Sequence, residues 1–486
     1  MNKKIEEILE EYKNIESFSQ AQRLMHWDME THMPEKGIDF RSEAMARIEM
    51  FQQEKIIKLH DKVDSVEMKD LTDIEKGIIR VLKRSIHYYI SIPPDVIKEL
   101  SRTTSKAAMV WRESRKRSDF SSFEPYLVRI VELQKQIASY LGYEKHPYNA
   151  LMDLYEEGFT VTDADEIFDK LLNNTKPILD KIIEERKFYV QHPLENKKYR
   201  IDSMKKVNEK VLEILKMPMD RFRMDVSAHP FTTHISMDDV RITTRYEGIN
   251  FKSTLFSTIH ESGHAIYELQ KDPSLAWTPV AGAPSLGFHE SQSRFFENII
   301  GRSIEFVHLL YPVLKENLPF VKDYDEHDIY IYFNTVNPSL IRVDADEVTY
   351  NYHIALRYEI EKNLLTGKFA VNDLPEIWND FMEKYLGIRP KNVSEGVLQD
   401  IHWSQGSFGY FPTYSLGNII SAIIRSRIKD LYENIGMGNI DYIKKFLGDK
   451  VHKYGSIYTP KDLLKMSFNE NYNPEYLIGY FREKYI

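Results

Sequence analysis

Two histidines and a glutamate near the middle of the chain have the types and spacing of a catalytic metal site. His260 and His264 are separated by three residues, and Glu261 follows the first of them, in the run NFKSTLFSTIHESGHAIYELQKD. Apolar residues recur at helical spacing in this run, which predicts one amphipathic helix. Positions four apart on a helix project from nearly the same face, so both imidazoles point to one place. Two neutral imidazoles and an adjacent carboxylate suit a zinc ion and the water that it activates.

A third metal ligand is expected from a following helix. Tyr267 and Gln270 stand where a metzincin has Gly and His, so that class is excluded. A gluzincin instead takes a glutamate from the next helix, and Glu290 and Glu297 are the candidates. We favour Glu290 because it shares a helix face with Arg294, which could hold its carboxylate from outside.

Length and composition predict a large globular protein without thiolate chemistry. A chain of 486 residues exceeds the usual size of a single core, so two lobes or one large helical body with a cleft are both plausible. The net charge of -9 argues against a nucleic-acid partner. Cysteine is absent, so histidine and carboxylate must hold any metal. The sequence shows no signal peptide and no apolar run of about 18 residues, which predicts a cytoplasmic protein without a membrane partner.

The hydrophobic periodicity predicts a mainly α fold with one exception. The exception lies just before the HESGH helix, where Phe231–Ser236 and Val240–Glu247 are rich in Thr, Ile and Val and flank a possible turn at residues 237–239. We expect a hairpin here, forming one small antiparallel β-sheet. Gly263 costs about 1 kcal/mol relative to Ala inside a helix, which predicts that another element packs closely against it.

The stretches around these residues resemble the thermostable carboxypeptidase Taq family of metallocarboxypeptidases. HESGHAIYE is followed by HESQSR, and the other characteristic stretches occur in order: HPF from His229, D-x-R-x-T from Asp239, IRVDADE from Ile341, GVLQDIHW from Gly396, and then GYFPTYSLGN. WDMETHMP near the start and NPEYL near the end extend the resemblance over essentially the whole chain. It implies a single catalytic domain over residues 1–486, a large helical body with a deep substrate cleft, which two helical lobes could flank.

The resemblance also implies roles for individual residues. The two histidines and Glu290 would bind one divalent metal ion per chain, and Glu261 would be the general base. Zinc is the expected metal, although a site of two histidines and a glutamate also accepts cobalt. A phenolic hydroxyl could hydrogen-bond the developing oxyanion, and the candidates are Tyr414, which we favour, and Tyr410.

Recognition of a free peptide C-terminus calls for a cationic side chain at the closed end of the groove. Arg241, in the second strand of the expected hairpin, and Arg342, in IRVDADE, are the arginines in family motifs. Arg342 could instead pair with the nearby Asp344, Asp346 and Glu347, and both roles remain open.

Three histidines in family motifs are further candidates for contact with the substrate: His229, His289 and His402. Asp400 could orient the ring of His402. The hairpin could also bind the substrate backbone as an added strand.

The function implied is that of a metallocarboxypeptidase that releases single residues from the C-termini of peptides with broad specificity. The family resemblance also implies a homodimer. An oligopeptidase or dipeptidyl carboxypeptidase on a similar scaffold is one alternative. A non-catalytic peptide-binding protein with a vestigial metal site is another.

Overall fold

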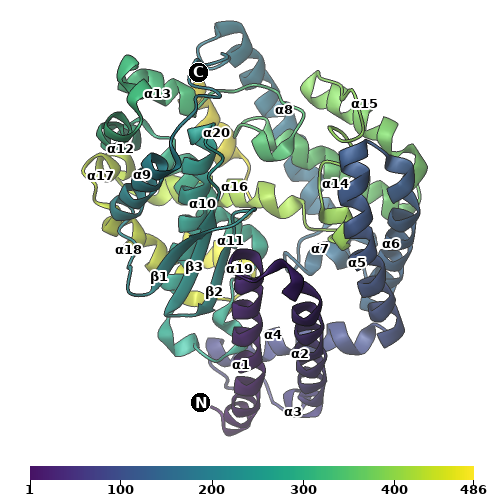
Figure 1. Ribbon diagram of the computed structural model, residues 1–486. Coiled ribbons are helices and arrows are strands. Elements are labelled where there is room, and N and C mark those ends of the chain that lie inside the picture. Colours follow the sequence, from purple (N-terminus) through teal and green to yellow (C-terminus); the bar gives the residue numbers. More distant parts are fainter. The chain divides into compact units, whose positions relative to one another are not determined.

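The computed structural model describes residues 1–486, and the fold is mainly α, as expected (Figure 1). The chain forms two compact units, each assembled from three segments. Unit 1 comprises Met1–Ile86, Gln191–Asn334 and Ile420–Asn471, and unit 2 comprises His87–Val190, Thr335–Ile419 and Tyr472–Ile486. None of the helices combines the length and the apolar character needed to cross a lipid bilayer.

Unit 1 holds the predicted metal-binding helix and the sheet. Its α-helices are α1 (Lys3–Thr31), α2 (Ile38–Lys58), α3 (His60–Asp64), α9 (Ile201–Ile214), α10 (Phe251–Leu269), α11 (Leu286–Arg294), α12 (Ile304–Asn317), α13 (Glu326–Phe333), α17 (Leu431–Gly436), α18 (Ile440–Lys450) and α19 (Pro460–Phe468). Its strands are β1 (Phe222–Val226), β2 (Thr232–Ser236) and β3 (Asp239–Thr244). A π-helical segment, Phe295–Gly301, continues α11.

Unit 2 is helical throughout. Its α-helices are α5 (Pro94–Arg117), α6 (Phe120–Leu141), α7 (Tyr148–Asp153), α8 (Val161–Glu185), α14 (Tyr350–Thr366), α15 (Leu374–Leu386) and α20 (Glu475–Tyr485). Two of the boundaries between the units fall inside helices, namely α4 (Asp73–Ser91) and α16 (Pro412–Arg427).

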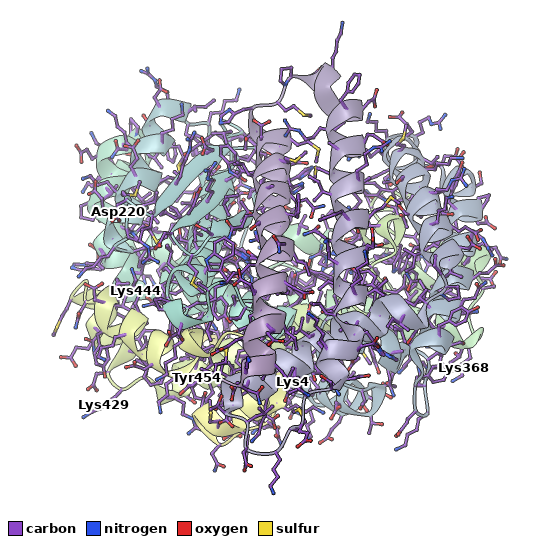
Figure 2. All side chains as sticks on the ribbon, turned by 90° about the horizontal axis from the view of Figure 1, so that it is seen from below. Lys4, Asp220, Lys368, Lys429, Lys444 and Tyr454 are labelled. Carbon is purple, nitrogen blue, oxygen red and sulfur yellow. The ribbon has the colours of Figure 1, made fainter.

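The first two helices of unit 1 lie side by side, as both views show (Figures 1 and 2; Lys4 marks the start of α1 in Figure 2). The chain turns between them at Pro34 and Gly37, which the sequence marks as breakers. Asn2 caps α1, because its side chain accepts a hydrogen bond from the backbone N–H of Lys4.

The sheet contains the expected hairpin and a strand that the sequence analysis did not identify. β2 pairs with β3 in antiparallel fashion, as predicted. β1 pairs with the other edge of β3 in parallel, so the strand order is β1-β3-β2 and the sheet is mixed rather than antiparallel. A parallel neighbour needs a crossover connection, which a hairpin motif does not reveal.

Helix α10 packs against this sheet and is almost entirely buried (Figure 1). Asn250 caps its N-terminus by accepting a hydrogen bond from the backbone N–H of Ser253. The close neighbour predicted at Gly263 is α11. A Cβ atom added to Gly263 would lie 2.6 Å from the carbonyl oxygen of Gln292 and 2.7 Å from the Cα of Ser293. Both contacts are to backbone, so the two helices approach as closely as they do only because residue 263 has no side chain.

Gly263→Ala is therefore expected to destabilise the protein. Ala favours a helix by about 1 kcal/mol over Gly, but overpacking against backbone costs about 1–3 kcal/mol. We expect the midpoint of denaturant-induced unfolding of unit 1 to fall. The matched control is Gly479→Ala in α20, where an added Cβ has nothing within 4 Å. The control should unfold at the same or a higher denaturant concentration, and a Gly263→Ala variant as stable as the control would contradict the packing argument.

Candidate metal centre

His260, His264 and Glu290 converge on one point of unit 1. One ligand atom from each side chain lies within 4.8 Å of the other two. Glu290 Oε2 is 3.7 Å from His260 Nε2 and 3.5 Å from His264 Nε2. Ligand atoms on a tetrahedral zinc ion, at about 2.0–2.2 Å from it, are separated from each other by about 3.3–3.6 Å. The donor types and their spacing therefore fit a divalent metal ion.

Glu297, the other candidate ligand, lies on the outer side of His260. Its Oε2 atom is 2.8 Å from His260 Nδ1, within hydrogen-bond distance. The other ring nitrogen of His260, Nε2, faces Glu290. A carboxylate on the second nitrogen of a histidine fixes the tautomer and orientation of a metal ligand. Glu297 itself accepts hydrogen bonds from Arg294 at 3.3 Å and from Arg302 at 3.1 Å. These contacts favour Glu290 as the third ligand and Glu297 as the residue that orients the His260 ring.

Arg294 holds both carboxylates, in agreement with the predicted shared helix face. Its Nε donates to Glu290 Oε1 at 2.7 Å. Burial alone would raise the pKa of Glu290, but Arg294 and the two histidines hold it well below its usual range. Burial lowers the pKa of His264 to about 3. Near neutral pH the site therefore offers an ionised carboxylate and, at His264, a neutral imidazole, which are the forms that bind metal.

Glu261 is buried and is oriented by a residue that sequence reasoning missed. The hydroxyl of Thr232 donates to Glu261 Oε2 at 2.6 Å. Burial raises the pKa of Glu261 above its usual value, although His260 and the bond from Thr232 act in the opposite direction. Thr232 lies in β2, and only the pairing of that strand beside α10 brings it to Glu261. The FTTHIS run gave no signal that distinguished Thr232 from Thr233.

His289 lies beside the metal-ligand cluster but is bound to a carboxylate. Its ring stacks on that of His264, with centroids 4.3 Å apart, and its Nε2 lies 3.0 Å from Glu268 Oε1. His229, by contrast, is exposed, and its backbone carbonyl accepts a hydrogen bond from Ser227.

Arg241 projects from the face of the sheet opposite to α10. Its neighbours Val240 and Ile242 pair with His234 and Thr232, which face α10. The Arg241 guanidinium donates two hydrogen bonds of 2.7 Å to Asp239. It also lies 4.6 Å from the ring centroid of Trp27. The metal-ligand cluster lies on the α10 side, so Arg241 does not face it.

Arg342, in unit 2, is buried and forms an ion pair whose partner the sequence did not reveal. Its Nε donates to Asp400 Oδ1 at 2.9 Å and its Nη1 to the hydroxyl of Tyr350 at 3.0 Å. Two of the three nearby acids are engaged by other residues: Asp346 accepts from Thr349, and Glu347 from Lys484. Arg342 therefore has the structural contacts of an ion pair, with Asp400 as its partner 58 residues further along the chain.

The remaining candidates of unit 2 form a cluster around His402. The Nε2 atom of His402 is 3.2 Å from the hydroxyl of Tyr414, and the Tyr410 ring lies 5.2 Å from that of Tyr414. The proposal that Asp400 orients His402 was wrong, since Nδ1 lies 3.9 Å from that carboxylate, beyond hydrogen-bond range. Burial lowers the pKa of His402 to about 4, so the ring is neutral near pH 7.

Asp400→Asn is expected to destabilise unit 2 by about 3–5 kcal/mol, because it leaves buried guanidinium groups without a counter-charge. Asp400 pairs with both Arg342 and Arg357, whose side chains are 7% and 0% exposed. Denaturant-induced unfolding at pH 7 measures the loss. Asp180→Asn is the control, since the Lys176–Asp180 pair on α8 is more than half exposed and contributes about 1 kcal/mol at most. Equal stability of the two variants would contradict this assignment.

The ion pairs of Asp400 with Arg342 and Arg357 also predict that the stability of the protein depends on pH. Burial alone would raise the pKa of Asp400, but Arg357 and Arg342 lower it below the value in the unfolded chain. The unfolded chain therefore takes up the proton first as the pH falls, and the stabilisation is complete above about pH 5 and is lost progressively below about pH 4. The free energy of unfolding should fall more steeply below pH 4 in the wild type than in Asp400→Asn.

Comparison with known proteins shows the family of the chain. A family model described as carboxypeptidase Taq (M32) metallopeptidase matches residues 7–485. Thermostable carboxypeptidase 1 of Pyrococcus furiosus is 49% identical, over 100% of this chain and 99% of its own. Carboxypeptidase 1 of Bacillus subtilis is 37% identical, over 97% and 96% of the two chains. The solved structure of Pyrococcus furiosus carboxypeptidase in an apo-Mg form has a TM-score of 0.99 at 48% identity, covering 100% of this chain and 99% of that one.

The family model matches nearly the whole sequence, and the chain is 37–49% identical to curated carboxypeptidases. The chain belongs to the carboxypeptidase Taq (M32) family of metallopeptidases, which are peptide hydrolases.

Proposed function

We propose that this protein uses one zinc ion per chain to release single residues from the C-termini of peptides, with broad side-chain specificity. The observation that carries the proposal is the convergence of His260, His264 and Glu290 beside a buried Glu261. Membership of the family supports a divalent metal and peptide substrates. The donor set favours zinc, and cobalt would also be accepted.

The residues of the centre divide the chemical work. His260, His264 and Glu290 would hold a divalent metal ion, which would polarise the scissile carbonyl and acidify the attacking water. Glu261 takes a proton from that water and delivers it to the leaving amine nitrogen. Its raised pKa suits both steps, since a carboxyl group nearer neutrality both accepts and returns a proton readily. Thr232 fixes the carboxylate by its hydrogen bond to Oε2.

The family resemblance implies further roles for residues of unit 2. Tyr414 donates its hydroxyl to the developing oxyanion, with Tyr410 as the alternative, and His402 holds the Tyr414 hydroxyl in place. Of the two candidate arginines for the substrate C-terminus, Arg342 lies beside Tyr414, but its guanidinium is also engaged in the ion pair with Asp400. Its guanidinium lies 5.0 Å from the ring centroid of Tyr414.

The remaining features of the proposal rest on the family resemblance and the sequence. His229 contacts the substrate, and the edge strand β2 receives the substrate backbone as an added strand. Residues 1–486 act as one catalytic domain in a cytoplasmic homodimer.

Glu261→Gln is expected to lower kcat by about 10²–10⁴-fold, because the amide cannot accept the proton. The variant should still bind one metal ion per chain, since Glu261 is not among the converging ligands. Steady-state peptide hydrolysis and metal analysis of the same sample measure the two effects. Glu209→Gln, at an exposed position of α9, is the matched control. Near wild-type turnover by Glu261→Gln would refute its role as general base.

A time course on a defined peptide tests the overall reaction. Mass spectrometry should show a ladder of products that differ by one residue from the C-terminus, and a chelator should abolish it. Steps of two residues or internal cleavage would instead show a dipeptidyl carboxypeptidase or oligopeptidase. Stoichiometric metal without hydrolysis of any peptide would favour a peptide-binding protein with a vestigial site.

A further inference from the structure

The two candidate histidine ligands are supported in different ways. The outer nitrogen of His260 has Glu297 at 2.8 Å. The outer nitrogen of His264, Nδ1, is buried and has no hydrogen-bond partner in the protein. Metal-binding histidines are usually held by a hydrogen bond from that nitrogen. The protein therefore supplies no hydrogen bond at Nδ1 that fixes the plane of the His264 ring.

The ring of His289 restrains this plane in another way. It lies almost parallel to the His264 ring, at an interplanar angle of 17° and a centroid separation of 4.3 Å. Stacking at this distance restricts rotation of His264 about its Cβ–Cγ bond, because a rotated ring would collide with its neighbour. His289 immediately precedes Glu290 on α11. The same short helix thus supplies one ligand and the support of another.

Glu268 holds His289 in turn. Its Oε1 atom lies 3.0 Å from His289 Nε2, and its Oε2 atom lies 3.1 Å from His234 Nδ1. Lys271 forms an ion pair with the same carboxylate, and both side chains are 3% exposed or less. A buried carboxylate with three partners is rigid, so the position of the His289 ring is well defined.

We propose that His289 is a positioning residue, whose ring fixes the plane of the metal ligand His264 by stacking, and that Glu268 fixes His289. The inference rests on the proposed metal site, and it differs from the sequence-based expectation that His289 contacts the substrate. Glu268 is the last residue of the HESGHAIYE stretch, and Lys271 lies three residues beyond it. The sequence pattern predicted no role for either residue, nor for His234 in the FTTHIS strand.

The test compares two substitutions of His289 by the affinity of the metal-free protein for zinc. His289→Ala removes the stacked ring and should weaken zinc binding by about 10–100-fold. Loss of a residue that orients a metal ligand has an effect of this size. His289→Phe keeps a flat ring but cannot bond to Glu268, and should recover most of that affinity. Competition with a chromophoric chelator measures each dissociation constant, and the visible absorption of cobalt-loaded protein reports the ligand geometry. The spectrum should change in the Ala variant and return toward that of the wild type in the Phe variant.

Three results separate this inference from the proposed function. Zinc binding by His289→Ala equal to that of the wild type would overturn the positioning role, and so would a Phe variant as weak as the Ala variant. Failure of the wild type itself to bind zinc would refute the metal site and with it the proposed function. His308→Ala, on α12, is the matched control, because its side chain is 68% exposed and pairs only with Glu326. Unfolding midpoints of the metal-free variants verify that each has folded.

Discussion

The close approach of α10 to α11 at Gly263 is the constraint on which the candidate centre depends. Two ligands come from α10 and the third from α11, so the distance between the helices sets the distance between the donors. Because the backbone of Gln292 and Ser293 occupies the space of a side chain at position 263, the helices lie closer than other residues would permit. The π-helical segment that follows α11 then carries Glu297 to the back of His260. Such segments are rare and are frequent at functional sites.

Burial of charge is the second constraint. Four carboxylates of the centre are buried, at Glu261, Glu268, Glu290 and Glu297. Three permanent cations face them: Arg294 and Arg302 near the ligands, and Lys271 at Glu268. Buried carboxylates are costly without counter-charges. The four carboxylates thus outnumber the Lys and Arg side chains by one. A divalent cation bound by His260, His264 and Glu290 would neutralise the remaining negative charge.

The sequence alone was sufficient for the parts of the site that depend on local periodicity. Spacing on one helix placed His260 and His264 together, and the helical face shared by Glu290 and Arg294 is present in the structure. The hairpin was also predicted, since alternation and turn residues are local signals. The family resemblance, rather than the spacing, supplied the functional interpretation.

What the sequence could not reveal depends on contacts between distant segments. β1 is short and rich in charged residues, and its parallel pairing with β3 leaves no local signature. Arg342 pairs with Asp400 rather than with acids near it in sequence, because Asp346 and Glu347 are engaged by Thr349 and Lys484. The bond from Thr232 to the general base likewise arises only when β2 packs beside α10.

The most direct test of the central claim is crystallography of the zinc-loaded protein with anomalous diffraction at the zinc edge. The proposed site predicts one strong anomalous peak per chain, about 2.0–2.2 Å from His260 Nε2, His264 Nε2 and a carboxylate oxygen of Glu290. Glu297 should remain on the outer side of His260. A peak coordinated by Glu297 in place of Glu290, or a strong peak elsewhere and none among these three residues, would contradict the assignment.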